Sequence, residues 1–162
     1  MKINLRKATP EDMQQVHALV FELATFEKEP HEVTTTPEIY LNDCFTEKRI
    51  DILVAEDMHI TNENKIIGIA LTYWAYSTWK GKYLWLDDLI VTEKYRGKGI
   101  GKLLFEATMQ KALDENAALF KWQVLDWNEP AIQFYNKYDA IYQKDWLTFK
   151  MTIEMMQQFV EK

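Results

Sequence analysis

The segment with the most specific chemical potential is the glycine-rich stretch EKYRGKGIGKLL, residues 93–104. Three glycines alternate with single residues, and Arg96, Lys98 and Lys102 make the stretch positive. A turn between a strand and a helix gathers backbone N–H groups without intrahelical acceptors, at the positive end of the helix dipole. Such a turn suits the oxygens of a phosphate, and glycine lets the backbone approach them closely. The pattern therefore predicts a phosphate-binding loop.

Two common phosphate-binding motifs do not match this stretch. A Walker A loop would need glycine in place of Arg96 and Ser or Thr in place of Leu103. A dinucleotide GxGxxG motif starting at Gly97 would need glycine in place of Lys102. The sequence thus argues against an ATP-binding or dinucleotide-binding loop. What does fit is RxxGxG, at Arg96, Gly99 and Gly101, although a glycine-rich turn without a ligand is the competing interpretation.

The size and composition of the chain indicate what must position this loop. A chain of 162 residues with 48% apolar and 27% charged side chains predicts one compact domain, 1–162. The start has no apolar stretch long enough for a secretion signal, and the most apolar run, 66–76, is too short to span a bilayer. These features predict a cytoplasmic protein with no membrane partner.

Charge and cysteine content exclude further kinds of site. The 19 basic and 25 acidic residues give a net charge of −6, which argues against a nucleic-acid partner and favours a cationic one. The one cysteine, Cys44, cannot form an internal disulfide or a CxxC site. The three histidines, His17, His31 and His59, lack metal-ligand spacing. We therefore predict no metal.

Hydrophobic periodicity predicts the elements around the loop. Apolar residues at helical spacing predict helices over 13–23 and 39–45, and branched and aromatic runs predict strands over 3–6, 50–56, 65–74 and 82–91. Turn residues at 62–64 and 79–81 make the consecutive strands antiparallel. The glycine turn then opens a helix that reaches residue 113. A strand over 118–125, a helix from 128 and closing strands over 141–143 and 147–151 complete an α+β, or mixed α/β, fold.

The RxxGxG loop directly follows an apolar strand end at 89–91 and resembles the acetyl-CoA pyrophosphate loop of the GNAT superfamily. The stretch WNEPAIQFY, 127–135, resembles a second segment of that superfamily, in which an asparagine starts a helix that carries a tyrosine. The stretches ELATFEKEPHEV, YSTWKGKYLWLDDLIV, YRGKGIG and VLDWNEPAIQFY are similar, in the same order, to the diamine (spermidine/spermine) and thialysine N-acetyltransferase branch. The resemblance covers roughly 3–151. It implies a GNAT acyl-CoA N-acyltransferase fold, with a central, mostly antiparallel, twisted sheet flanked by helices.

The resemblance also implies acetyl-CoA as cosubstrate, without a metal, and a set of residues around it. The implied cofactor-binding residues are Leu89, Ile90, Val91, Arg96, Gly97, Lys98, Gly99, Ile100, Gly101, Lys102, Asn128, Glu129, Pro130 and Ala131. Tyr135 matches the catalytic tyrosine of the family. The implied amine pocket contains Phe26, Glu27, Trp79 and Asp87, with Asp88 nearby.

These residue types suit acetyl transfer to an amine. An aliphatic amine has a pKa of about 10.4, so roughly one molecule in a few thousand is neutral and nucleophilic at pH 7. Asp87 is the candidate that attracts the cation and removes its proton, and Tyr135 is the candidate acid for the departing thiolate. Asp87 and Asp88 are adjacent on a strand, so only one should face the amine unless a bulge intervenes. Without the family resemblance, Tyr135 would read as a core tyrosine.

The sequence therefore predicts an N-acetyltransferase that moves the acetyl group of acetyl-CoA to a primary amine of a small polyamine, diamine or thialysine-like substrate, by direct attack in a ternary complex. The resemblance also implies a homodimer. The alternatives are a protein lysine or N-terminal acetyltransferase and a non-catalytic acyl-CoA-binding module. Asp139 and Asp145 stand where relatives often have glycine, and at position 139 this predicts an aspartate able to adopt a left-handed backbone.

Overall fold

A computed structural model describes residues 1–61 and 65–160; the turn predicted at 62–64 lies outside the described residues. The chain divides into two compact units, Met1–Gln123 and Val124–Lys162, which we describe separately. The single domain expected from the sequence stays a prediction. Among the described residues, no helix has the length and hydropathy that crossing a bilayer requires.

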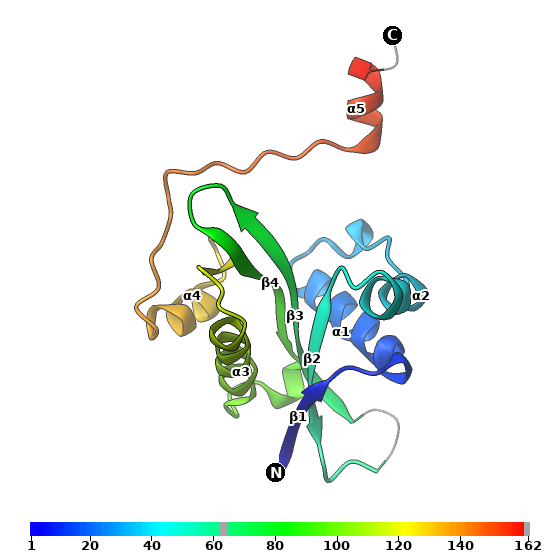
Figure 1. Cartoon of the computed structure of the whole chain (residues 1–162). Coiled ribbons are helices and arrows are strands. Elements are labelled where there is room, and N and C mark those ends of the chain that lie inside the picture. The colour runs from blue at the N-terminus through cyan, green and yellow to red at the C-terminus, as the bar shows by residue number, and fades with distance from the viewer. Residues whose placement is uncertain (62–64, 161–162) are drawn as a thin grey trace. The chain divides into compact units, whose positions relative to one another are not determined.

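The first unit is built on a five-stranded sheet. Its order is β1 (Ile3–Lys7), β2 (Asp51–Asp57), β3 (Ile66–Ser77), β4 (Gly81–Val91) and β5 (Phe120–Trp122). The first four strands pair antiparallel, and β5 pairs parallel with β4. Helices α1 (Met13–Phe26) and α2 (Pro37–Leu41) cover one face, and α3 (Ile100–Asp114), the crossover between β4 and β5, covers the other (Figure 1). The mostly antiparallel α+β sheet is as predicted.

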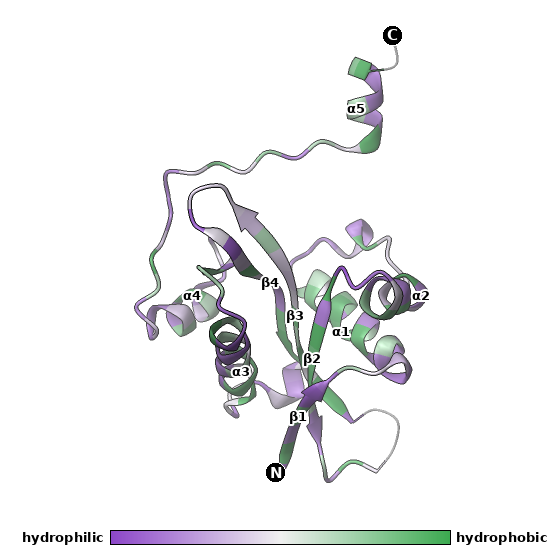
Figure 2. Cartoon of the chain, in the orientation of Figure 1, coloured by the Kyte–Doolittle hydropathy of each residue, from purple (hydrophilic) through white to green (hydrophobic). Residues whose placement is uncertain are grey.

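The two faces of the sheet are held by separate apolar layers. Met13, Val16 and Leu19 of α1 are buried against Ile69 and Leu71 of β3, and the hydrophobic positions appear green along these elements in Figure 2. On the α3 face, the most completely buried side chains are Leu84, Leu86, Leu104 and Phe105. Each residue buried to this degree contributes about 1.5–3 kcal/mol of transfer free energy, so the sheet is a firm platform for its loops.

The second unit contains α4 (Glu129–Asn136) and α5 (Ile153–Val160). The predicted start of α4 is confirmed: the Asn128 side chain accepts a hydrogen bond from the Ala131 N–H at 3.3 Å, and Pro130 lies in the first turn. Asp139 has a φ of 52°, the left-handed backbone predicted for it. The sequence analysis did not predict α5.

The strands predicted at 141–143 and 147–151 are wrong, because neither segment is a strand in the structure. Apolar side chains of this segment are largely exposed, with Ile141 90% and Phe149 88% accessible. A β-prone sequence forms a strand only when a neighbouring strand pairs with its backbone, so propensity alone does not decide the outcome. Strand β5 covers Phe120–Trp122 and is shorter than the predicted 118–125.

A charged cluster joins β1, β2 and the start of α1. The Arg6 guanidinium donates to Asp12 Oδ2 at 2.6 Å and to Glu56 Oε1 at 2.6 Å. Both carboxylates are 95% buried, while Arg6 keeps about a quarter of its surface exposed. The hydrogen bond from Arg6 is the main reason that the pKa of Glu56 falls from 4.5 to about 2. Arg6 thus compensates two carboxylates that solvent does not reach.

We expect Arg6→Met to lower the free energy of unfolding by about 3–5 kcal/mol at pH 7, because it removes the ion-pair partner of buried Asp12 and leaves buried Glu56 paired with Lys65 alone. The lowered pKa of Glu56 contributes stability that is present above pH 4.5 and is lost as the pH falls toward 2. The difference in unfolding free energy between the wild type and Arg6→Met should therefore shrink in acid. Urea titrations at pH 7 and pH 3 measure both effects. Arg49→Met, which breaks an exposed pair with Asp43, is the control and should cost no more than about 1 kcal/mol. An equal loss in the two variants would contradict the assignment.

Candidate functional site

The turn between β4 and α3 presents backbone N–H groups in an unusual conformation. Gly97 and Gly99 have φ angles of 72° and 81°, and Gly99 is the N-cap of α3 without a side-chain capping bond. Within the described residues, the N–H groups of Gly97, Lys98 and Gly99 donate to no other backbone group. The first N–H groups of α3 likewise lack intrahelical acceptors. The turn therefore offers a set of N–H donors at a helix N-terminus.

Glycine is required here by conformation and not by packing. A Cβ atom at Gly97 or Gly99 would meet nothing within 4 Å, but the positive φ would strain any L side chain. Successive N–H groups in such a conformation form a concave site for anions. The donor set fits the diphosphate of a coenzyme, in the place where the sequence predicts it.

The other predicted cofactor residues of the first unit lie beside this turn. Leu89, Ile90 and Val91 end β4, and Ile90 is buried in the core, so only its backbone could reach a ligand. β4 pairs with β5 only between Leu84↔Phe120 and Leu86↔Trp122. No described strand pairs with the outer edge of 87–91. Lys98 and Lys102 are exposed, with the Lys98 ammonium 4.8 Å from the Tyr95 ring centre.

Arg96 is directed toward α1. Its Nε donates to the Val91 carbonyl oxygen at 2.9 Å, and its guanidinium lies 5.1 Å from the centre of the Phe26 ring. Its Nη2 is 3.8 Å from the Glu22 carboxylate, which also accepts the Glu93 N–H at 2.8 Å. The sequence analysis missed Glu22. No motif marks it, and its position one helical turn before Phe26 was the only available signal.

A β-bulge at Asp87 determines on which face of the sheet the two adjacent aspartates lie. Leu71 pairs with Asp88 and Thr72 with Leu86, so Asp87 is an extra residue in β4. Leu71 lies in the core on the α1 face, and directly opposite residues share a face, so Asp88 is placed on that face. Asp87 Oδ1 accepts the Trp85 indole N–H at 3.1 Å, and the Tyr73 hydroxyl is hydrogen-bonded to Asp87. The bulge thus breaks the alternation that would otherwise separate the two aspartates.

Burial and mutual repulsion shift the acids of this group. Burial, reinforced by the charges of Asp87 and Glu27, raises the pKa of Asp88 to about 7. Burial also raises the pKa of Glu27. The pKa of Tyr73 rises to about 12, through burial first and then through the charge of Asp87. A half-buried carboxyl group that titrates near neutral pH, beside two further acids, can bind a cation and accept a proton from it.

The structure does not bring every predicted residue to this acidic group. Phe26 and Glu27 are at the end of α1, and the charge of Glu27 acts on Asp88. Trp79 lies at the β3–β4 turn and is 83% exposed. The last pair of the hairpin, Ser77–Gly81, is six steps from the pair Leu71–Asp88, which at about 3.4 Å per residue is roughly 20 Å, and Trp79 lies beyond it in the turn. Its place in the amine pocket stays a prediction.

The remaining predicted residues belong to the second unit. Asn128 caps α4, and Glu129, Pro130 and Ala131 form its first turn. Tyr135, on the same helix, is half-buried, and burial raises its pKa to about 12. Its hydroxyl therefore stays protonated throughout the neutral range, as a donor must.

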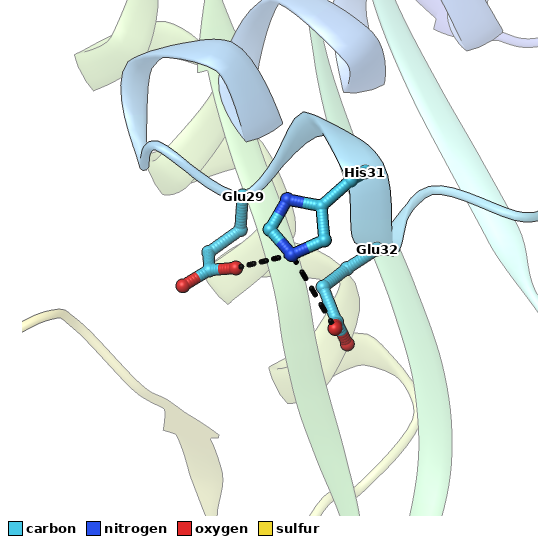
Figure 3. A group of neighbouring side chains, drawn as sticks. All are labelled: Glu29, His31 and Glu32. Carbon is cyan, nitrogen blue, oxygen red and sulfur yellow. Dashed lines mark ion pairs between the residues drawn. The ribbon is translucent and has the colours of Figure 1, made fainter.

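A separate group of potential metal ligands lies after α1. His31 Nε2 is 3.3 Å from the Glu29 carboxylate and 3.8 Å from the Glu32 carboxylate. Figure 3 shows the imidazole between the two carboxylates. In the part of the chain that the structure describes, these three residues are the one group of His, Cys, Asp and Glu with atoms close enough to share an ion. All three are largely exposed, so their side chains are ordinary surface ion pairs.

Comparison with known families decides what kind of protein carries this site. Residues 16–139 match the family described as "Acetyltransferase (GNAT) family". The chain belongs to this family. The GNAT fold and the family resemblance predicted from the sequence are thereby confirmed, and the chain is an acetyltransferase.

Individual relatives support the same placement within the GNAT family. The thialysine N-epsilon-acetyltransferase of Mus musculus is 33% identical over 161 residues, which cover 95% of each chain. The spermidine/spermine N(1)-acetyltransferase-like protein 1 of Homo sapiens is 29% identical and covers 85% of this chain, but the match spans 20% of that longer protein. A solved structure of a tetramutant of the BH1408 protein from Bacillus halodurans superposes with a TM-score of 0.71 at 26% identity, covering 91% of this chain and 99% of that one.

Proposed function

We propose that this GNAT acetyltransferase transfers the acetyl group of acetyl-CoA to a primary amine of a small polyamine, diamine or thialysine-like substrate. The observation that carries the proposal is the bulge at Asp87, which gathers Asp87 and Asp88 of β4 with Glu27 at the end of α1, ten residues before Gly97. An acidic group selects a cation, and the turn offers donors for a diphosphate. Relatives named for thialysine and spermidine/spermine acetylation support the substrate class.

Each part of the site has a proposed role. The N–H groups from Gly97 to Lys102 hold the diphosphate, with the end of β4 and the start of α4 as further contacts, and acetyl-CoA supplies the activated acetyl thioester. Asp88, titrating near pH 7, accepts the proton of the bound ammonium. Asp87, hydrogen-bonded by Trp85 and Tyr73, adds charge that attracts the substrate. Tyr135 donates its proton toward the departing sulfur.

We assign the role of general base to Asp88, and not to Asp87 as predicted from the sequence, because the two carboxylates differ in their hydrogen bonds and in their burial. The Asp87 carboxylate already accepts two hydrogen bonds, from Trp85 and Tyr73, and its side chain is exposed. Asp88 is the more buried of the two, and its raised pKa matches the operating pH of a general base. Direct attack by the neutral amine then needs no covalent intermediate on the protein. Cys44 is not required, and burial raises the pKa of its thiol.

We further propose a homodimer, supported by the apolar side chains that one chain leaves uncovered. Tyr142, Trp146, Leu147 and Phe149 are between 71% and 88% exposed. Large exposed apolar surfaces mark interaction sites. Sedimentation equilibrium should give twice the chain mass of 19.3 kDa, whereas a stable monomer at micromolar concentration would contradict the proposal. The cytoplasmic location expected from the sequence stays a prediction.

A panel assay tests the substrate class. Acetyl-CoA consumption should be fastest with spermidine, diamines and thialysine, slower with lysine, and slowest with peptides that carry a lysine or a free N-terminus. Acceptors with two positive charges should be preferred because three acids line the site. If peptides are the best acceptors, the chain is a protein acetyltransferase. If no amine is acetylated although CoA binds, the non-catalytic module is the correct interpretation.

A further inference from the structure

Glu22 and Arg96 join two parts of the site that are remote in the sequence. Glu22 lies in the last turns of α1, and one of its carboxylate oxygens accepts the Glu93 N–H at 2.8 Å. Glu93 begins the short 3-10 turn Glu93–Tyr95 that leads from β4 into the glycine loop. A side chain of α1 therefore fixes the first residue of that turn.

Arg96 follows the last residue of the same turn and contacts the elements on both sides of it. Its Nε donates to the carbonyl oxygen of Val91, the last residue of β4, at 2.9 Å, and its Nη2 lies 3.8 Å from the same Glu22 oxygen. Its backbone N–H donates to the Glu93 carbonyl at 3.1 Å. The guanidinium thus bridges the end of β4 and α1, directly before Gly97.

The amine side of the site is attached to the same helix. Phe26 follows Glu22 by four residues, so both side chains lie on one face of α1, and the Arg96 guanidinium is 5.1 Å from the Phe26 ring centre. Glu27, whose charge acts on Asp88, is the C-cap residue of α1 and donates its N–H to the Leu23 carbonyl. Arg96 therefore contacts the end of α1 that leads directly into Glu27.

We propose that Glu22 and Arg96 form a clasp, the Glu22–Arg96 clasp, which holds the glycine loop in its binding conformation and couples coenzyme affinity to amine affinity. The inference rests on the proposed function, and it assigns positioning roles to both residues. In this role Arg96 shapes the loop with its side chain, and the N–H groups that follow it contact the ligand.

The geometry also sets the size of the expected effect. The Glu22–Arg96 pair is long, and the two side chains are 34% and 41% exposed, so the ion pair alone contributes little. The hydrogen bond from the Glu93 N–H to a carboxylate is short and charge-assisted, so it is the stronger contact. We therefore expect coupling near the lower end of the usual range, about 5- to 10-fold in affinity.

The test is a set of calorimetric titrations with CoA, with spermidine, and with spermidine at saturating CoA. In the wild-type protein, CoA should tighten spermidine binding by about 5-fold. Glu22→Ala removes both contacts and should weaken CoA binding by about 10-fold and abolish the coupling. Glu22→Gln keeps an oxygen that accepts the Glu93 N–H, so it should restore most of the CoA affinity. Glu29→Gln removes an equal charge just beyond α1, away from the loop, and should match the wild type.

A double-variant cycle separates the clasp from direct diphosphate binding by Arg96. If Arg96 and Glu22 hold the loop as one clasp, the loss of CoA affinity in Glu22→Ala/Arg96→Met should be clearly smaller than the product of the two single-variant losses. If the two losses multiply, the clasp is refuted. Unchanged CoA affinity and coupling in Glu22→Ala would refute it as well.

Hydrogen exchange tests the clasp without a ligand. The Glu93 amide should exchange at least about 10-fold faster in Glu22→Ala than in the wild type, while core amides of β3 keep their protection. Equal exchange would overturn the clasp even if CoA binds. If wild-type protein binds no CoA, the proposed function fails, and the exchange experiment still decides whether Glu22 holds the turn.

Discussion

Tyr135→Phe is expected to reduce turnover about 100-fold or more, while CoA affinity changes by less than about twofold. Burial raises the pKa of Tyr135 to about 12, so the hydroxyl is protonated at every pH at which the enzyme would be assayed. The substitution removes one donor and keeps the ring. Its effect should therefore fall on the chemical step and spare coenzyme binding.

Single-turnover rates with saturating acetyl-CoA and amine measure this effect, with CoA affinity taken from calorimetry. Tyr138→Phe is the matched control, because it removes a phenol hydroxyl three residues later in the same segment. It should keep at least half of the wild-type rate. Equal rates for Tyr135→Phe and the wild type would exclude Tyr135 as the acid.

Asp88→Asn should lower kcat/KM for the amine by about 100-fold at pH 8, because the general base is lost. In the wild type, kcat/KM should rise with pH through about 7, as the Asp88 carboxyl group ionises. The ratio of wild-type to variant activity should therefore grow from pH 5.5 to 8 and then level off. A constant ratio over this range would contradict the assignment of Asp88.

Asp87→Asn gives a different result and serves as the comparison. The charge of Asp87 is the second cause of the raised pKa of Asp88, after burial, so its removal should move the pH midpoint to a lower value. Turnover at high pH should persist, with a weaker preference for dicationic amines. An unshifted midpoint would show that the two carboxylates do not interact.

Unfolding measurements on Asp88→Asn distinguish a loss of activity caused by the missing base from one caused by a destabilised fold. Folding raises the pKa of Asp88 from 3.8 to about 7, so between these two pH values the folded protein keeps a proton on Asp88 that the unfolded chain releases. The contribution of Asp88 to the free energy of unfolding therefore falls as the pH rises from 3.8 to about 7. At pH 8 the wild type carries a half-buried charge that Asn lacks. The thermal midpoint of Asp88→Asn at pH 8 should accordingly be no lower than that of the wild type.

Local signals made two features of the chain predictable from the sequence, the β4–α3 turn and the start of α4. Glycines before an apolar helix mark the β4–α3 turn, because positive φ angles at Gly97 and Gly99 strain any other residue. Asn128 followed by Pro130 marks the start of α4, because the cap bond and the fixed proline φ act within one turn. Features that depend on a few consecutive residues can be predicted from the sequence without knowledge of the fold.

Features that depend on pairing between residues distant in the sequence could not be predicted from the sequence. The bulge at Asp87 is a property of register between β3 and β4, so alternation alone could not place both aspartates. Glu22 contacts Glu93 across 71 positions of sequence, and no motif around either residue indicates this contact. The predicted strand at 147–151 failed for a related reason, since its backbone has no strand partner among the described residues.

A calorimetric titration of purified protein with CoA, beside one with S-acetylpantetheine, which lacks the diphosphate and the 3′-phosphoadenosine attached to it, tests the central claim most directly. If the N–H groups from Gly97 to Lys102 hold a diphosphate, CoA should bind at one site per chain, at least about tenfold more tightly than S-acetylpantetheine. No uptake of CoA, or equal affinity for the two compounds, would contradict the account.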